Sequence, residues 1–138
     1  MKEYTLENIE TSIEDAKKVV ILHEGKKYTY FDEGSTRFVY VSEDEKYVIK
    51  VEKFRLGKFN QEEQSVYDNA SEEDKKFLVE TTLLQRGHIF QRYVTPIKFG
   101  GKKLSKEQKA FADSCRGEVG WDSKGNLLCY DLSEYKKY

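Results

Sequence analysis

The chain has 138 residues, of which 24 are basic and 25 acidic, giving a net charge of −1 at pH 7. This balance excludes the strongly basic surface that nucleic-acid-binding proteins use. An aromatic content of 14% argues against disorder and predicts a packed interior. The length predicts one domain over residues 1–138, and the apolar runs are too short to cross a membrane.

The N-terminus and the cysteines predict a cytoplasmic protein. Met1–Tyr4 begins no apolar segment of the kind found in signal peptides. The two cysteines, Cys115 and Cys129, are too few for a disulfide scaffold, and no His/Cys spacing indicates a zinc site. A reducing cytoplasm is therefore the expected compartment.

The first part of the chain predicts a helix and then an antiparallel meander. The helix is expected over Thr5–Ala16, where Thr5 can cap it and apolar residues recur at helical spacing: Leu6, Ile9, Ile13 and Ala16. Val19–Leu22 and Tyr28–Phe31 follow as two strands joined by a turn at Gly25.

The stretch Gly34–Val51 predicts a β-hairpin, because β-branched and aromatic residues flank the polar segment Ser42–Lys46. Gly34 opens the first strand, where a backbone without a side chain can approach a phosphate closely. Lys50 lies inside the apolar second strand, where its charge needs a partner.

A helix is expected from Asn60, with Glu63 three residues further on at the spacing of a capping box. Three interpretations of this segment stay open. Glu63 pairs with Lys50, or it only closes the capping box, or Glu62 pairs with Lys50 instead. A second, short helix is expected from Ser71, because acidic residues follow it in the first turn.

The last part of the chain predicts four strands and one helix. Thr81–Gln85 and His88–Thr95 are expected as strands, and Ser105 and Gln108 form a capping box that opens a helix to about Asp113. A closing hairpin is expected from its two short apolar strands and the turn-rich loop between them: Val119–Trp121, Asp122–Asn126 and Leu127–Tyr130.

Several of these features occur in the order found in protein kinases. Three segments carry this order: Gly34-Ser-Thr-Arg-Phe-Val-Tyr, Asp113-Ser-Cys-Arg-Gly-Glu118 and Asp131-Leu-Ser. The last of them directly follows a predicted strand. With Lys50 on a strand and Glu63 on the next helix, the chain resembles a reduced protein-kinase-like domain. It is similar to small kinase-like proteins of bacteriophages and bacteria.

The resemblance implies an α+β fold in two parts. About residues 1–95 would form an antiparallel five-stranded sheet with a packed helix, like the N-terminal lobe of kinases. About residues 96–138 would form a much-shortened C-terminal lobe that ends in a β-hairpin. A second copy of the chain is one way to supply the missing lobe, so a homo-oligomer is among the expectations.

The resemblance also implies ATP and Mg²⁺ as cofactors and a role for each matching residue. The glycine loop would cover the phosphates, Lys50 would hold them, and Glu63 would orient Lys50. Asp113 would be the catalytic base. The full set of implied site residues is Gly34, Ser35, Thr36, Arg37, Lys50, Glu63, Gln91 and Tyr93 for the nucleotide, Glu118 and Asp131 for the metal, and Asp113 for catalysis.

Departures from the kinase pattern leave two functions open. Glu118 stands where kinases have a metal-binding asparagine, Ser133 replaces a glycine, and only five residues follow Ser133. One function is an ATP- and Mg²⁺-dependent phosphotransferase that acts on a protein or another hydroxyl acceptor. The other is an inactive pseudokinase that binds or inhibits a partner protein, with or without nucleotide. An α+β domain unrelated to kinases would keep Lys50 and Glu63 far apart.

Overall fold

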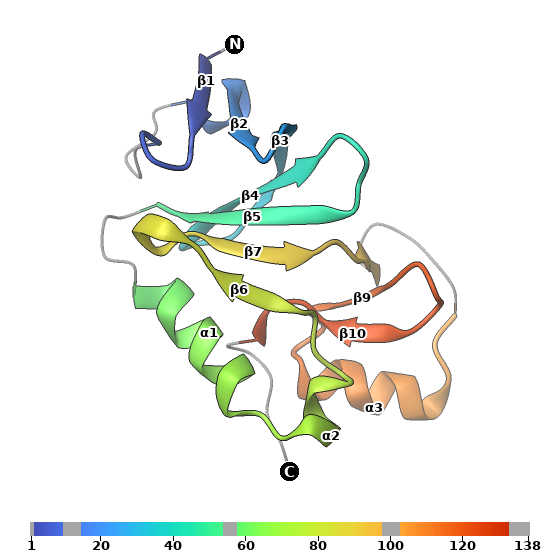
Figure 1. Ribbon diagram of the computed structural model, residues 1–138. Helices are drawn as coiled ribbons and strands as arrows, with labels where there is room; N and C mark the ends of the chain where they lie inside the picture. Colours follow the sequence, from blue (N-terminus) through green and yellow to red (C-terminus); the bar gives the residue numbers. More distant parts are fainter. Residues whose placement is uncertain (1, 10–14, 54–57, 98–102, 133–138) are drawn as a thin grey trace.

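The computed structural model describes residues 2–9, 15–53, 58–97 and 103–132. Two β-sheets and three α-helices form the described part of the chain, with the large sheet above and the helices along the lower side (Figure 1). None of the described helices is long and apolar enough to cross a membrane.

The large sheet has seven strands in the order β1-β2-β3-β4-β5-β7-β6. Their bounds are β1 Lys2–Thr5, β2 Val19–His23, β3 Lys26–Glu33, β4 Arg37–Ser42, β5 Tyr47–Glu52, β6 Thr81–Leu83 and β7 Ile89–Arg92. β1 runs parallel to β2, and every other neighbouring pair is antiparallel. The hairpin β4–β5 therefore lies in the middle of the sheet, and its two strands carry Arg37 and Lys50.

The small sheet has three antiparallel strands in the order β10-β9-β8. These are β8 Thr95–Pro96, β9 Val119–Trp121 and β10 Leu127–Cys129. Gly120 allows β8 and β9 to approach closely, because a Cβ atom there would lie 2.7 Å from the carbonyl oxygen of Thr95.

The α-helices are α1 Lys58–Asn69, α2 Glu72–Lys75 and α3 Lys106–Ser114, and two 3₁₀ turns span Ala16–Lys18 and Gln85–Gly87. The sequence signals at α2 and α3 are confirmed. Ser71 caps α2 by accepting from the backbone amide of Asp74. Ser105 and Gln108 form the predicted capping box of α3.

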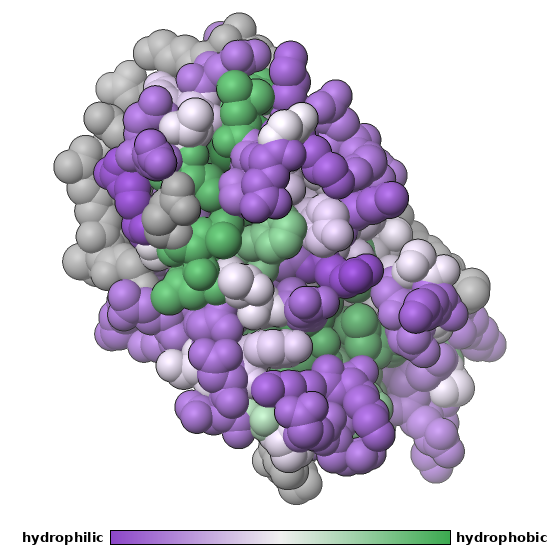
Figure 2. All heavy atoms as spheres, in the orientation of Figure 1, coloured by the Kyte–Doolittle hydropathy of each residue, from purple (hydrophilic) through white to green (hydrophobic). Residues whose placement is uncertain are grey.

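Buried apolar residues form two clusters. The first packs the large sheet and contains Leu6, Ile9, Val19, Ile21, Tyr28, Tyr40, Ile49 and Val51. The second lies among the helices and the small sheet and contains Leu78, Val79, Val94, Ala112, Cys115, Val119, Cys129 and Leu132. On the face shown in Figure 2, hydrophilic residues cover most of the surface, and a band of apolar residues lies over the large sheet.

The predicted five-stranded antiparallel sheet is wrong. β1 and β2 extend the large sheet past β3, and the β1–β2 pair is parallel. The predicted strand His88–Thr95 is also divided, because β7 ends at Arg92 and Thr95 begins β8. Thr95 and Pro96 pair with β9, so the closing hairpin becomes a three-stranded sheet.

The helix predicted over Thr5–Ala16 is wrong in its described part. Thr5 ends β1, and the chain then turns, with the amides of Asn8 and Ile9 donating to the carbonyl oxygen of Thr5. This turn buries Leu6 and Ile9 on one side, which is why they have helix-like spacing in the sequence. Residues 10–14 lie outside the described part of the chain.

Candidate functional site

A cavity of about 500 Å³ lies where the β3–β4 loop, β5, the segment after β7 and the end of β10 come together. Its lining combines aromatic and aliphatic residues with charged ones. The apolar part includes Phe31, Val39, Val48, Tyr93, Val94 and Pro96. The charged part includes Asp32, Glu33, Arg37, Lys50, Glu62, Arg92, Glu118 and Asp131. A lining of this mixed kind fits a ligand with a flat apolar group and a charged group.

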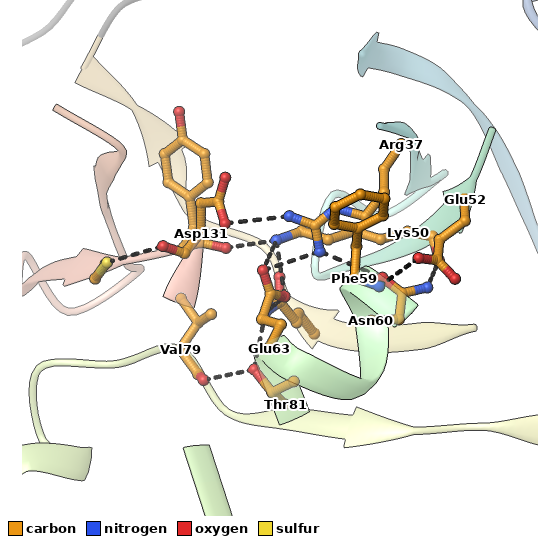
Figure 3. A network of polar contacts seen from close by, with 12 residues as sticks. Arg37, Lys50, Glu52, Phe59, Asn60, Glu63, Val79, Thr81 and Asp131 are labelled. Carbon is orange, nitrogen blue, oxygen red and sulfur yellow. Dashed lines mark hydrogen bonds and ion pairs between the residues drawn. The ribbon is translucent and has the colours of Figure 1, made fainter. Parts of the chain in front are cut away.

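Lys50 is a buried cation in the cavity wall, with only 4% of its surface exposed. Its Nζ lies 3.0 Å from both carboxylate oxygens of Glu63 and 2.6 Å from the carbonyl oxygen of Tyr130 (Figure 3). An ammonium group has three protons, so these three acceptors satisfy it. Burial lowers the pKa of Lys50, and the carboxylate of Glu63 opposes that effect. The predicted Lys50–Glu63 pair is thus present.

Arg37 extends this pair into a network that joins four elements. Its Nη1 donates to Glu63 Oε1 at 3.0 Å, and its Nη2 donates to Asp131 Oδ1 at 3.1 Å (Figure 3). Burial disfavours the charged guanidinium, but Glu63 and Asp131 outweigh it and raise the pKa of Arg37. Ion pairs therefore connect strands β4 and β5, helix α1 and the segment after β10.

Asn60 is an interior residue of α1, so the predicted capping box with Glu63 is wrong. The helix begins at Lys58, and Asn60 is fully buried. Its Nδ2 donates to the carbonyl oxygens of Lys50 at 3.1 Å and Gly87 at 2.7 Å. Asn60 and Glu63 are three residues apart and face the sheet together, which fixes α1 against it.

Glu52 supplies the cap that the sequence assigned to Asn60. Its Oε1 accepts from the backbone amide of Phe59, in the first turn of α1, at 2.6 Å (Figure 3). A carboxylate at this end of a helix satisfies a free amide and complements the helix dipole. The strand that carries Lys50 therefore also positions the helix that carries Glu63.

The cavity gathers most of the residues that the resemblance implied. Those that line it are Gly34, Ser35, Thr36, Arg37, Lys50, Gln91, Tyr93, Glu118 and Asp131. Glu63 is fully buried behind Lys50. Asp113 lies elsewhere, because it is an exposed residue in the last turn of α3 and is not part of the cavity lining.

Sequence reasoning missed three contributors to the site and assigned the wrong role to a fourth, Asn60. The i, i+3 spacing of Asn60 and Glu63 does indicate one helix face. No sequence signal indicates that Glu52 accepts from the amide of Phe59. Thr81 and the backbone carbonyl of Tyr130 carry no sequence signal of their own, because only the fold brings them to Gln91 and Lys50.

Glu118 and Asp131, the two implied metal ligands, are only partly consistent with a metal site. Among the described residues, no group of three or more His, Cys, Asp or Glu side chains is arranged to hold a metal ion. Glu118 and Asp131 both line the cavity, which fits Mg²⁺ bound by one or two carboxylates together with phosphate oxygens. Arg37 already contacts Asp131, so a metal ion would compete with that ion pair.

Comparisons with protein-family models, curated proteins and solved structures find no match to this chain. The function is therefore inferred from the geometry of the cavity. Its central feature is a lysine and a glutamate, buried together, beside a glycine-containing loop.

Proposed function

We propose that the protein is a kinase-like nucleotide-binding module that takes ATP with Mg²⁺ in this cavity and does not transfer its phosphate. The observation that carries the proposal is the buried Lys50–Glu63 pair at the wall of a cavity bordered by Gly34. In kinases the same pairing holds the phosphates of ATP under a glycine-rich loop.

The order and placement of the other parts support the proposal. The glycine loop lies between β3 and β4, Lys50 on β5, Glu63 on the following helix, and Asp131 after β10. This is the order that the kinase resemblance implies. A volume of about 500 Å³ is also within the usual range of about 300–1,000 Å³ for small-molecule sites.

Lys50 can bind a phosphate without leaving Glu63. Two of its three hydrogen bonds go to the carboxylate, and the third goes to a neutral carbonyl oxygen of Tyr130. A phosphate oxygen is a stronger acceptor than a neutral carbonyl, because its hydrogen bond is charge-assisted. Glu118 and Asp131 would hold Mg²⁺, which neutralises phosphate charge next to these acidic residues.

The position of Asp113 favours binding over phosphoryl transfer. A general base must lie within hydrogen-bond reach of the acceptor hydroxyl. Asp113, the residue that the resemblance assigns to this role, is exposed on α3 and does not line the cavity. The cavity lining therefore includes the residues that the resemblance implies for nucleotide binding but not the implied base.

The proposal is tested by thermal unfolding with ATP, with and without Mg²⁺. A ligand at about 100 times its dissociation constant stabilises the folded state by about 2.7 kcal/mol, which raises the melting temperature by several degrees. Val39→Trp should abolish this shift, because Val39 lines the cavity and a larger side chain would fill it. Val41→Trp is the matched control, since Val41 lies on the same strand two residues on and does not line the cavity.

Lys50→Met provides a second variant, in which the ammonium group is lost. We expect it to unfold at a lower temperature and to show no shift with ATP and Mg²⁺. A wild-type protein without a Mg²⁺-dependent shift at millimolar ATP would overturn the proposal. So would a shift that survives in Val39→Trp at the wild-type size.

A further inference from the structure

The hydrogen bonds of Gln91 fix which end of its side-chain amide is the oxygen. Nε2 donates to Glu63 Oε2 and to Thr81 Oγ1, both at 2.8 Å. The carboxylate of Glu63 only accepts, and the hydroxyl proton of Thr81 is donated to the carbonyl oxygen of Val79 at 3.0 Å. Both neighbours therefore need a donor, and a reversed amide would place its oxygen against a carboxylate.

The remaining atom of that amide is a buried acceptor. Within the described part of the chain, no donor reaches Gln91 Oε1. A buried acceptor without a partner is costly, and native structures contain few of them. Gln91 also lines the cavity, so a ligand in the cavity lies against this residue.

The surroundings of Gln91 indicate which part of a ligand would meet it. Gln91 pairs across the sheet with Val48, and the nearby lining includes Phe31 and Tyr93, whose rings pack edge to face with centroids 5.6 Å apart. This apolar and aromatic lining suits a base ring. A phosphate presents mainly acceptor oxygens at neutral pH, which Oε1 would repel.

We propose that Gln91 selects nucleotides whose base carries an exocyclic amino group, with Oε1 accepting a hydrogen bond from that group. The inference rests on the proposed nucleotide-binding function and adds the base specificity. Only 1% of Gln91 is exposed and Oε1 itself is buried, so a donor reaches Oε1 only if the cavity wall shifts to admit a small group. An amino group on the edge of a ring meets this requirement.

The test compares three nucleoside triphosphates in the presence of Mg²⁺ by calorimetry on the wild-type protein. ATP carries the amino group, purine riboside triphosphate has a hydrogen in its place, and inosine triphosphate has a carbonyl oxygen. We expect ATP to bind about tenfold to a hundredfold more tightly than either analogue, because each leaves Oε1 without a donor.

Gln91→Met removes the acceptor, and the ratio of ATP to purine riboside triphosphate affinity should then fall close to one. Gln64→Met is the matched control: Gln64 also has a buried Oε1 without a donor in the described chain, but it does not line the cavity. The ratio of ATP to purine riboside triphosphate affinity in Gln64→Met should equal that of the wild type.

Each other outcome overturns a distinct claim. Equal affinity of the wild type for all three nucleotides would overturn the inference and leave the proposed function intact. Discrimination that persists unchanged in Gln91→Met would also overturn the inference. Binding of none of the three would overturn the proposed function and the inference with it.

Discussion

The charged network around Glu63 and the end of helix α3 differ in how their acidic residues are held. Glu63 is fully buried and bound by Lys50, Arg37 and Gln91. Asp113 is exposed, one position beyond the buried Ala112. Both were expected in one site. The position of a buried charged side chain therefore depends on its charged partners, whereas that of an exposed acidic side chain depends on the register of its own helix.

The register of α3 follows from its cap. Ser105 and Gln108 fix the start of the helix, and Ala112 faces the core in its last turn. Adjacent residues of a helix point about 100° apart, so Asp113 is directed away from that core. This orientation follows from the helix register, because the helix buries its apolar side against the core.

Glu63→Gln is expected to have the largest effect, because it leaves the cations of Lys50 and Arg37 without their shared carboxylate. Removing one partner from a buried charge network costs about 3–5 kcal/mol. Urea unfolding of the variant and the wild type measures this loss. A loss below about 1 kcal/mol would mean that Glu63 does not hold the network together.

The pH dependence of stability tests a second buried group beside the network. Burial lowers the pKa of His88 to about 4, and the nearby charge of Arg86 adds to this effect. The unfolded chain, with an ordinary pKa of 6.5, then binds more protons between pH 6.5 and about 4. The contribution of neutral His88 to the free energy of unfolding is therefore fully present above pH 6.5. It is lost as the pH falls towards 4, by up to about 3 kcal/mol.

His88→Leu should remove that slope. Urea unfolding at pH 7.5 and pH 4.5 gives the difference for each protein. The wild type is expected to lose more stability than the variant over this interval. The same loss in both proteins would show that another group, and not His88, causes the pH dependence.

Ser105→Ala tests the cap that sets the register of α3. Loss of the side-chain acceptor should cost about 1 kcal/mol. Ser65→Ala, at an exposed position inside α1, is the matched control and should change stability by less than about 0.5 kcal/mol. Equal effects of the two changes would deny the capping box a role in stability.

Asp113→Asn is expected to have the smallest effect, since the side chain is exposed and outside the cavity. Stability should change by less than about 0.5 kcal/mol, and Mg²⁺-dependent ATP affinity should stay within about twofold of the wild type. Asp131→Asn, by contrast, should weaken that affinity by tenfold or more. Calorimetric titration of both variants makes the comparison, and a similar loss in Asp113→Asn would place that residue in the site.

Local sequence signals predicted the elements that depend on neighbouring residues. The hairpin within Gly34–Val51, the closing hairpin from Val119 and the capped helix from Ser105 all have signals within a few residues. The Lys50–Glu63 pair was also within reach, because a lysine in an apolar strand requires a partner. Predicting these parts of the fold and site required no information about contacts between residues far apart in the sequence.

The parts that failed depend on long-range pairing. Arg37 and Asp131 are separated by 94 positions, and no local pattern indicates their ion pair. Lys2–Thr5 forms a strand because β2 offers it a parallel edge, although Leu6 and Ile9 have the spacing of a helix. Asn60 fits a capping-box motif, but α1 begins at Lys58, and Glu52 on β5 accepts from a backbone amide in its first turn.

The proposed function has two halves: the cavity binds ATP with Mg²⁺, and the bound ATP stays intact. Equilibrium dialysis with ATP labelled on its γ-phosphate, in the presence of Mg²⁺, tests both halves in one measurement. We expect the wild-type protein to retain label, Val39→Trp to retain none, and the retained label to be recovered as ATP. No retention by the wild type would contradict the proposed ATP binding. Label transferred to the protein or to an added hydroxyl acceptor would contradict the proposal that the phosphate is not transferred.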